Sequence, residues 1–402
     1  MGEKAKKILI LSTSYLPMVG GSEIAIKEVT DRLLDFNFDL ITAHSPTLSL
    51  KEEKMGRTNV FRVGGRFSLS DFLLPKNFLP ISMFLKASEL IKKNGPYDLV
   101  HVFQASQAAG AAWLLKWRHP KLPILLTLQE GQDLKRQKFL KKFFRRLIVG
   151  KIDSATAISN YLKNYVLKLR KSLPVEVIPN GVDSAKFSGE FSYGELSELA
   201  DRLDILPDEK VIVSTGRLVL KNGLDILIKA FAILVSNDKE IRHKLLLIGD
   251  GSQRQELVGL AESLGVVDKV VFVKHVSQDE LPKYLKISHV FVRPSRSEGL
   301  GISFLEAMAA GLPVVGTAVG GITDFLVHNQ TGLICDGSRP EDVAEKIKTL
   351  IEDRELRKMV AKNGQELVRE KYDWDKITLE YARIYNDVIS KGSSVLQLGL
   401  DE

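Results

Sequence analysis

Short runs of apolar, β-forming residues alternate with helix-length segments along most of the chain. In the first half, these runs lie at residues 7–13, 39–44, 97–102, 123–128, 154–159 and 175–179. Strands buried on both faces of a parallel sheet have this near-continuous apolar pattern. Because helix-length segments separate the runs, the first half predicts a parallel sheet with helices on both faces.

The alternation starts again after residue 181. Its runs lie at residues 210–216, 244–251, 269–273, 289–295, 313–317 and 331–335. Residues 48–80 are less regular, and we expect loops there around one short strand at 59–63. One helix is expected from Ser22 and another over residues 104–116. From residue 340 the pattern is helical, with an interruption at 372–374 before a final helix of about 18 residues.

The two series of runs predict two α/β domains. A chain of 402 residues is long enough for two domains that each bury a core. Residues 178–187 join the halves through an Asn-Gly turn, without a Gly/Ser-rich linker. We therefore expect doubly wound domains over residues 1–182 and 183–374. Because the connection between them is short, they would face a central cleft, and ligands of open α/β sheets bind at the carboxyl ends of the strands.

Residues 290–315, VFVRPSRSEGLGISFLEAMAAGLPVV, raise the question of what two carboxylates do beside a helix start. A strand-like run breaks at Pro294 into a glycine-bearing loop, which leads into a short helix pattern. Seven residues separate Glu298 in the loop from Glu306 in the helix. Ser303 and Glu306 fit a capping box, a purely structural role, but this does not explain Glu298. Carboxylates accept several hydrogen bonds, so the pair could bind the hydroxyl groups of a sugar.

Two further loops combine a strand end with glycine. Gly20 and Gly21 follow the first strand, where free amides at a helix start could bind an anion; alternatively, Ser22 only caps the helix. After the first strand of the second half, Arg217 and Lys221 could neutralise a diphosphate, or could form a solvated surface pair. A nucleotide sugar would suit this combination of carboxylates, cations and amides.

These motifs resemble, in their order along the chain, those of the family 4 glycosyltransferases, which have the GT-B fold. The matching segments are PMVGGSE, VEVIPNGVD, GRLVLKNG, LLLIGDGSQ, the 290–315 segment and VGGITDFL, and the resemblance runs from residue 7 to residue 385. It implies two Rossmann-like domains, with a nucleotide-sugar donor bound mainly by the C-terminal domain and an acceptor mainly by the N-terminal domain. It also implies that a final helix within residues 375–402 packs back on the N-terminal domain.

The resemblance assigns roles to individual residues. Glu298 would contact the hydroxyls of the donor sugar and Glu306 those of the ribose. Arg217 and Lys221 would stabilise the departing diphosphate, which Gly20 and Gly21 would approach from the other domain as the cleft closes. Further donor-binding positions are Gly216, Gly249, Gly299, Leu300 and Gly301. The acceptor side is assigned to Gln129, which is also a catalytic candidate, and to Glu130 and Asn180.

The chain departs from the family pattern at two positions. Many relatives have a histidine where this chain has Gln129, and because glutamine does not titrate, a role in carrying a proton is in doubt there. Gln129 could still hydrogen-bond a sugar hydroxyl or orient the acceptor. Many relatives also have a lysine directly before the glycine at 223, where this chain has Asn222. The sequence leaves open whether Lys221 or Asn222 occupies the diphosphate position.

Composition narrows the function further. The single cysteine, Cys335, cannot form an internal disulfide, and no Cys/His cluster has metal-ligand spacing, so we expect no metal and no other cofactor. No signal peptide or membrane-spanning run is apparent, so a cytoplasmic location is expected. A dehydrogenase would need G-x-G-x-x-G after a strand, and the chain lacks this motif.

Charge is distributed unevenly along the chain. Residues 1–182 contain 29 Lys and Arg against 15 Asp and Glu, a net charge of +14, whereas the rest of the chain carries −7. A basic domain suggests an anionic membrane surface, a phosphorylated substrate or nucleic acid. The chain has no zinc-finger spacing and no aromatic-rich β-platform motif, so nucleic acid is not expected as a partner.

Residues 134–151, LKRQKFLKKFFRRLIVGK, form the most basic segment of that half. Its large apolar residues recur at helical spacing opposite lysine and arginine; they are Phe139, Leu140, Phe143, Phe144, Leu147 and Ile148. A helix that lies on a membrane surface has this pattern. The alternative is a helix whose apolar face packs on the sheet while its charges are solvated.

The sequence therefore predicts a metal-independent, retaining glycosyltransferase, cytoplasmic or peripheral at the inner face of a membrane. Its partners would be a nucleotide-sugar donor and a glycan or (glyco)lipid acceptor. The alternatives are a GT-B sugar-nucleotide epimerase and a non-catalytic protein that binds nucleotide sugars. The donor, the acceptor, the linkage and the oligomeric state do not follow from the sequence.

Overall fold

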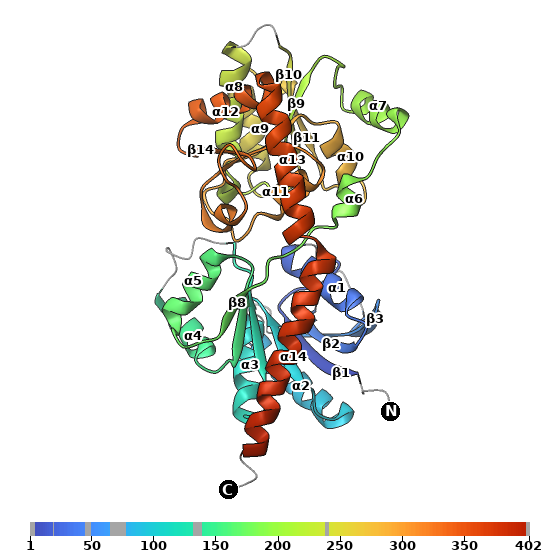
Figure 1. Cartoon of the computed structure of the whole chain (residues 1–402), viewed down its shortest axis with the longest axis vertical. Coiled ribbons are helices and arrows are strands. Elements are labelled where there is room, and N and C mark those ends of the chain that lie inside the picture. The colour runs from blue at the N-terminus through green and yellow to red at the C-terminus, as the bar shows by residue number, and fades with distance from the viewer. Residues whose placement is uncertain are drawn as a thin grey trace, which may run out of the picture. The chain divides into compact units, whose positions relative to one another are not determined.

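The structure is a computed structural model that describes residues 5–18, 20–44, 50–64, 78–131, 139–237 and 241–398, with the side chains of residues 140, 141 and 393–398 left out. The chain divides into two compact units (Figure 1). The N-terminal unit comprises Met1–Asn180 and Trp374–Glu402, and the C-terminal unit comprises Gly181–Asp373.

The N-terminal unit is built on a sheet in the order β3-β4-β2-β1-β5-β6-β7-β8. Seven strands are parallel: β1 (Lys6–Ser12), β2 (Phe36–Ala43), β4 (Thr58–Val63), β5 (Leu99–Phe103), β6 (Ile124–Leu128), β7 (Ser154–Ala157) and β8 (Val175–Val177). Strand β3 (Glu52–Met55) runs antiparallel to β4 at the edge. In the centre of the sheet Ile8 of β1 lies beside Phe38 of β2 and Leu99 of β5, so buried apolar residues form continuous rows across the strands.

Helices cover both faces of this sheet. Its helices are α1 (Gly21–Arg32), α2 (Leu79–Asn94), α3 (Gln107–Arg118), α4 (Phe139–Val149), α5 (Asn160–Leu169) and α14 (Trp374–Leu398). Alternate residues of β1, such as Ile8 and Ile10, share a core with α1 and with the buried Trp374 and Tyr385 of α14. Helices α2 and α3 contact the strands from the other side, because successive side chains of a strand point to opposite faces.

A buried polar row joins α14 to this sheet. His101 of β5 is fully buried; its Nδ1 is 2.7 Å from the Tyr385 hydroxyl and its Nε2 is 2.6 Å from the Thr127 hydroxyl. Thr127 lies in turn 2.6 Å from the hydroxyl of Thr156 on β7. Helix α14 therefore contacts the sheet through polar as well as apolar groups.

The C-terminal unit contains a parallel sheet in the order β11-β10-β9-β12-β13-β14. These strands are β11 (Val270–Val273), β10 (His243–Ile248), β9 (Lys210–Thr215), β12 (Val290–Arg293), β13 (Val314–Thr317) and β14 (Leu333–Cys335). The chain direction across the sheet reverses between β9 and β12, and such a switch point leaves a crevice for ligands at the carboxyl ends of these strands.

The two faces of β12 contact different helices. Val290 and Val292 belong to the core under α8 (Leu224–Asn237) and α12 (Pro340–Glu352). Phe291 instead packs edge-on against Phe304 of α11 (Ile302–Ala309), with ring centroids 5.0 Å apart. The remaining helices of the unit are α6 (Ser184–Ser188), α7 (Tyr193–Arg202), α9 (Arg254–Ser263), α10 (Leu281–Lys286) and α13 (Arg354–Lys371), with the short turns η1 (Leu220–Asn222), η2 (Val267–Lys269) and η3 (Gly320–Asp324).

The predicted α/β architecture with two helix-covered, mainly parallel sheets is confirmed. Several details of the prediction are wrong. Strand β3 was expected to be loop, and the final helix has 25 residues and already includes Trp374. Within the described ranges, no helix is both long enough and apolar enough to cross a membrane.

Candidate active site

The loops after β9 and β12 meet at the carboxyl edge of the C-terminal sheet. Gly223 has a φ of 71°, and a Cβ there would lie 1.9 Å from the carbonyl oxygen of Pro294. Gly320, with a φ of 57°, would likewise place a Cβ 1.8 Å from the carbonyl oxygen of Glu298. Only glycine permits both the backbone conformation and the close approach at these positions. Gly223 and Gly320 therefore pack against the backbone of the Glu298 loop, at Pro294 and at Glu298 itself.

Glu298 lies at the centre of this arrangement. Its residue is 8% exposed, and Oε2 accepts a 2.8 Å hydrogen bond from Nη2 of Arg293. Oε1 accepts from Nζ of Lys221 at 3.3 Å and from its neighbour Gly299 N at 3.1 Å. Burial opposes ionisation of Glu298, but the charges of Arg293 and Lys221 outweigh burial and hold its pKa below the usual value. The carboxylate is therefore charged and oriented.

Lys221, and not Asn222, directs its side chain to this site. The ammonium of Lys221 contacts Glu298, whereas Asn222 is 2% exposed and binds the carbonyl oxygen of Arg217 and the guanidinium of Arg293. Burial lowers the pKa of Lys221. The charge of Glu298 raises this pKa, and the positive charges of Arg293 and Arg217 lower it. Lys221 therefore lies beside Glu298, with Arg217 exposed close by, and its place at a diphosphate stays a prediction.

Glu306 lies on α11, away from the helix start. Its residue is 7% exposed, and Oε1 accepts a 3.1 Å hydrogen bond from Nε2 of Gln278. Burial raises the pKa of Glu306 to about 7, although the Gln278 hydrogen bond opposes this. The capping-box interpretation is wrong: α11 is preceded by Gly301 without a side-chain cap, and the Ser303 hydroxyl accepts from Arg293.

The other predicted donor positions lie in these loops and in the loop after β10. Gly216 and Gly249 follow the neighbouring strands β9 and β10, and Gly249 N donates to the carbonyl oxygen of Val273. Gly299 and Leu300 are buried between Glu298 and α11. The structure therefore brings the predicted donor residues of the C-terminal unit together at one edge of its sheet.

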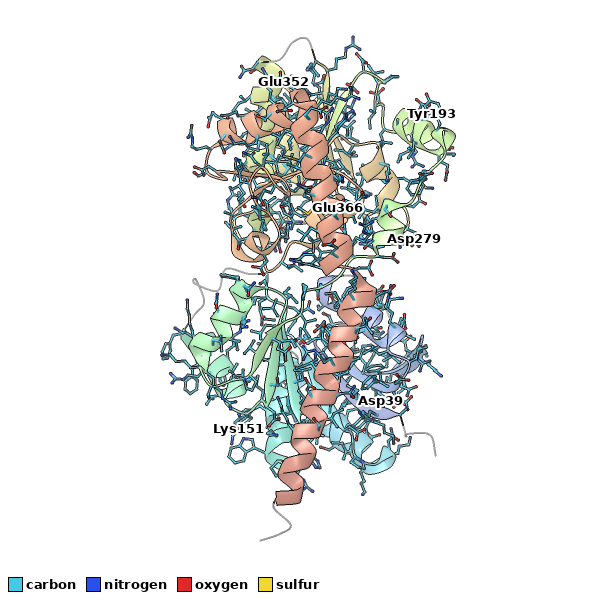
Figure 2. All side chains as sticks on the ribbon, in the orientation of Figure 1. Asp39, Lys151, Tyr193, Asp279, Glu352 and Glu366 are labelled. Atoms are coloured by element: carbon cyan, nitrogen blue, oxygen red, sulfur yellow. The ribbon has the colours of Figure 1, made fainter. Side chains whose placement is uncertain are left out.

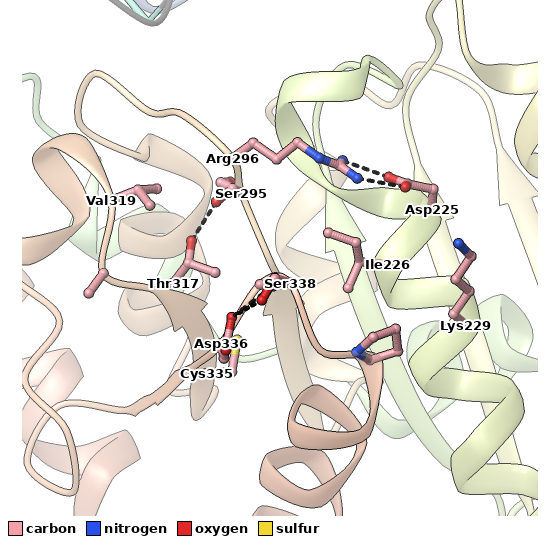
Figure 3. A pocket seen from close by; sticks show the side chains of 13 residues that line it. Asp225, Ile226, Lys229, Ser295, Arg296, Thr317, Val319, Cys335, Asp336 and Ser338 are labelled. Atoms are coloured by element: carbon pink, nitrogen blue, oxygen red, sulfur yellow. Dashed lines mark hydrogen bonds and ion pairs between the residues drawn. The ribbon is translucent and has the colours of Figure 1, made fainter. Parts of the chain in front are cut away.

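A cavity of about 680 Å³ opens beside these loops (Figure 3). It is lined by segments that follow β12, β13 and β14 and by the first turns of α8. A two-bonded ion pair between Arg296 and Asp225 forms one wall, at 2.7 Å for each bond. Among the described lining residues none is a predicted donor residue. This cavity is therefore distinct from Glu298 and its partners Arg293 and Lys221, which we call the Glu298 cluster.

Two of the predicted acceptor residues pair with one another in the N-terminal unit. Gln129 follows β6, and its amide nitrogen donates to Asn180 at 3.1 Å while its oxygen accepts from the Asn180 amide at 2.9 Å. Asn180 also donates to the carbonyl oxygen of Gly21, the first residue of α1. Ser22 does not cap this helix as the simpler interpretation held, because Gly20 is the capping residue.

Glu130 is bound separately, by a residue of α4. Its Oε1 accepts from Nη2 of Arg145 and from the backbone amide of Ala105, both at 3.0 Å. The other oxygen, Oε2, is buried and has no hydrogen-bond partner within the described residues. Arg145, which is 4% exposed, thus anchors α4 to the carboxyl edge of the N-terminal sheet.

Sequence reasoning missed several polar residues at this edge. Glu23 accepts from the hydroxyls of Ser14 and Ser22, and Ser22 accepts from Gln104. Gln104 has a φ of 71°, which is unusual for a residue other than glycine. This turn also delays α3, which begins at Gln107 and not at 104. No local pattern signals the cluster, since its members come from three segments.

Comparison with known proteins identifies the family. The model described as Glycosyltransferase Family 4 matches residues 19–186, and the model described as Glycosyl transferases group 1 matches residues 197–367. An uncharacterized glycosyltransferase of Methanocaldococcus jannaschii is 30% identical in an alignment 412 positions long, which covers 94% of this chain and 97% of that protein. The chain is a family 4 glycosyltransferase.

Further matches cover nearly all of this glycosyltransferase. A GDP-mannose-dependent α-(1-6)-phosphatidylinositol monomannoside mannosyltransferase of Mycobacterium tuberculosis is 27% identical over 94% of this chain and 97% of its own. Among solved structures, sucrose-phosphate synthase of Thermosynechococcus elongatus matches with a TM-score of 0.82 and 20% identity, over 96% of this chain and 100% of its own.

A second solved structure matches at a similar level. HepE of Anabaena in complex with UDP-glucose has a TM-score of 0.78 and 21% identity, over 95% of this chain and 99% of its own. At these identities the likeness shows the fold, and the predicted GT-B fold is confirmed. The roles of individual residues in the glycosyltransferase stay predictions.

Proposed function

We propose that this glycosyltransferase moves a sugar from a nucleotide-sugar donor to a glycan or (glyco)lipid acceptor, with retention of the anomeric configuration. The observation that carries the proposal is the Glu298 cluster. A charged carboxylate beside Lys221 and the exposed Arg217 offers acceptors for sugar hydroxyls and cations for a diphosphate in one place. The relatives that use GDP-mannose or bind UDP-glucose support a nucleotide sugar as the donor.

Arg217 and Lys221 would act on the leaving group. As the bond to the sugar breaks, negative charge accumulates on the departing diphosphate, and fixed cations there lower the barrier. In a same-face displacement the diphosphate itself would help to take the proton of the acceptor hydroxyl. Catalysis then consists of positioning and charge stabilisation by the chain's own residues. We propose that no metal takes part, and transfer that is unchanged by a chelator would support this.

The residues of the N-terminal unit would serve the acceptor. The paired amides of Gln129 and Asn180 present hydrogen-bonding groups without a titrating proton carrier. Glu130 has one buried oxygen with no partner among the described residues, which could accept a hydroxyl hydrogen bond. These assignments, and the approach of Gly20 and Gly21 to a donor phosphate, are part of the proposal.

The decisive experiment starts with binding. Thermal unfolding in a panel of UDP, GDP and ADP sugars should reveal the donor, because a ligand of the native state raises its stability. Incubation with that donor and candidate acceptors should then release nucleoside diphosphate and extend the acceptor. Isomerised product from donor alone would instead indicate an epimerase, and binding without any turnover would indicate a non-catalytic protein. Well-folded protein that takes up no nucleotide sugar would overturn the proposal.

We also propose that the N-terminal unit docks on an anionic membrane surface through α4. Four large apolar residues of this helix, Phe139, Phe143, Phe144 and Leu147, are 83, 49, 55 and 41% exposed. The alternative, in which this apolar face packs on the sheet, does not account for that exposure. The side chain of Leu140 and residues 134–138 lie outside the described part of the chain.

Basic groups surround these apolar side chains. Lys142 and Arg146 of α4 are exposed, and nearby Lys151 (labelled in Figure 2) lies 4.9 Å from the ring of Trp117, which is 65% exposed. Exposed aromatic residues interleaved with cations complement an interface of acyl chains and anionic head groups. We call these residues of α4, with Trp117 and Lys151, the aromatic–basic surface. The protein would then be peripheral at the cytoplasmic face of a membrane.

Liposome flotation tests the docking. The protein should float with vesicles that contain anionic lipid, and less with neutral vesicles or at high salt. Replacement of Phe143 and Phe144 by serine should abolish flotation, whereas Leu85→Ser, at an apolar residue of α2 that is 60% exposed, should leave it unchanged. No flotation of the unaltered protein at low salt would reject the docking, but not the transferase.

A further inference from the structure

A buried arginine lies directly beneath the Glu298 cluster. Arg293 is the last residue of β12 and is 7% exposed. Because side chains alternate along a strand, Arg293 points to the same face as Phe291, under the first turn of α11. A guanidinium removed from water is costly unless its charge and its N–H groups find partners.

The guanidinium joins four segments of the C-terminal unit. Nη1 donates to the carbonyl oxygen of Thr215 at the end of β9, at 3.3 Å, and to the hydroxyl of Ser303 on α11. Nη2 donates to Oδ1 of Asn222 at 2.9 Å and to Oε2 of Glu298 at 2.8 Å. Its fixed planar fork therefore sets the spacing between the loops that carry Lys221 and Glu298.

Asn222 is one of the two residues at which this chain departs from the family pattern. Its side-chain amide is hydrogen-bonded in the interior, with Nδ2 donating to the carbonyl oxygen of Arg217 at 2.6 Å and Oδ1 accepting from Arg293. A lysine at this position, as the resemblance implies for many relatives, would place an ammonium against the Arg293 guanidinium. Arg293 thus carries the positive charge that a lysine at position 222 would otherwise provide.

Arg293 and Lys221 hold Glu298 in different ways. The Arg293 bond is short, at 2.8 Å, and the arginine side chain is 8% exposed. The Lys221 contact is longer, at 3.3 Å, and the lysine side chain is 24% exposed. A diphosphate that approaches the loop could therefore draw Lys221 away from Oε1 while Arg293 keeps its hold on Oε2.

We propose that Arg293 is a positioning residue that serves as the permanent counter-ion of Glu298, so that Lys221 can exchange from Glu298 to the donor diphosphate. The exchange frees Oε1 to accept a sugar hydroxyl without leaving a buried carboxylate uncompensated. This inference rests on the proposed function, because it presupposes a nucleotide sugar at the Glu298 cluster. It adds a residue that touches neither sugar nor diphosphate.

A double-mutant cycle between positions 222 and 293 tests the inference. Arg293→Met should raise KM for the nucleotide sugar at least tenfold. It should also move the acidic limb of the kcat/KM profile to higher pH, because Glu298 then loses its main counter-ion. Asn222→Lys alone should raise KM by at least the same factor, since two cations would meet in the interior. The KM of the double variant should be at least tenfold lower than that of Asn222→Lys, and two independent sites would not show this recovery.

Two further variants separate positioning from folding. Arg293→Lys keeps the charge and should retain the pH profile of the unaltered protein while losing activity through the lost fork. Arg357→Met removes a half-buried arginine that binds carbonyl oxygens at the end of α12, and it should leave KM and the pH profile unchanged. Thermal unfolding of each variant shows whether it is folded before its kinetics are read.

The outcomes are distinct. If the unaltered protein binds no nucleotide sugar, the proposed function fails and this inference fails with it. If it binds and transfers, but Arg293→Met keeps its pH profile or the effects at 222 and 293 simply add, then Arg293 is only structural. That result would overturn the inference and leave the transferase intact.

Discussion

Arg217 is the exposed cation beside the Glu298 cluster. Its replacement tests whether a positive charge there stabilises the leaving group. Arg217→Ala should lower kcat by about a hundred- to a thousand-fold, the usual effect of losing one group that stabilises transition-state charge. The unfolding temperature should hardly change. Steady-state assays measure the effect, with Arg354→Ala on α13, another exposed arginine of the same unit, as the control. Unaltered turnover in Arg217→Ala would reject its assignment.

Glu306 should link donor binding to protons. Burial raises its pKa to about 7, so the free protein holds much of this carboxyl protonated below neutral pH. If the ionised form accepts the ribose hydroxyls, affinity should increase about tenfold from pH 6 to pH 8 and level off above that. Calorimetry should use a nucleotide sugar, because its esterified diphosphate does not titrate near neutrality as a free terminal phosphate does.

The variant Glu306→Gln provides the control for this linkage. Glutamine has nearly the same shape and cannot titrate, so the affinity of the variant should be independent of pH over the same range. A variant that keeps the pH dependence would show that another group is responsible.

The sequence predicts Glu298 and Lys221 at one site, and the structure brings their side chains into contact, while their roles stay predictions. They lie in glycine-bearing loops after strands, where a side chain is exposed to the crevice. Arg293 was missed because it ends an apolar run and reads as the start of the loop. Its direction depends on which face of β12 meets α11, and a strand's own sequence does not specify that.

His101, which joins α14 to its sheet, should make the free energy of unfolding of the N-terminal unit depend on pH. Burial lowers the pKa of His101 to about 3, whereas an unfolded histidine titrates near 6.5. As the pH falls, the unfolded chain therefore binds the extra proton first. The contribution of His101 to the free energy of unfolding is fully present above about pH 6.5 and is lost progressively as pH falls towards 3. Between pH 7 and pH 5 the loss amounts to about 2 kcal/mol.

Urea unfolding at the two pH values measures this contribution. His101→Gln should be less stable at pH 7, because the contacts to Tyr385 and Thr127 are altered, but it should lack that pH-dependent loss. An equal loss in both proteins would show that other groups cause the acid sensitivity.

Most elements could be predicted from the sequence because strands buried on both faces keep their apolar pattern wherever they pair. Strand β3 could not, since Glu52–Met55 is mostly polar and exists through its antiparallel pairing with β4. The aromatic pattern of α4 was recognised, but whether it faced the sheet or solvent depended on Arg145. This buried arginine occupies the inward side of the helix, where an apolar residue would be expected.

On the scale of the whole molecule, the predicted donor residues of the cluster belong to one continuous unit. Residues 181–373 contain Arg217, Lys221, Glu298 and Glu306 together with a core of their own. Expressed alone, this segment should fold and bind the nucleotide sugar with an affinity within about tenfold of the full chain. Circular dichroism checks folding and calorimetry checks binding. A folded segment without affinity would show that the N-terminal unit supplies essential donor contacts.

The opposite charges of the two halves could be counted from the sequence, and so could the repeated α/β pattern. The substrates could not, because the groups that would choose a base, a sugar or an acceptor lie in contacts between side chains from distant segments. The cluster of Ser14, Ser22, Glu23 and Gln104 illustrates this, since three separate stretches of chain meet there.

All three tryptophans, Trp113, Trp117 and Trp374, belong to the N-terminal unit. Trp374 is 3% exposed in the core shared with α14, whereas Trp117 stands open to solvent. Indole fluorescence is therefore an intrinsic optical probe of one half of the protein only. Its red shift during denaturation would time the melting of that half separately from the other. A blue shift on adding vesicles would mark the entry of Trp117 into an apolar layer.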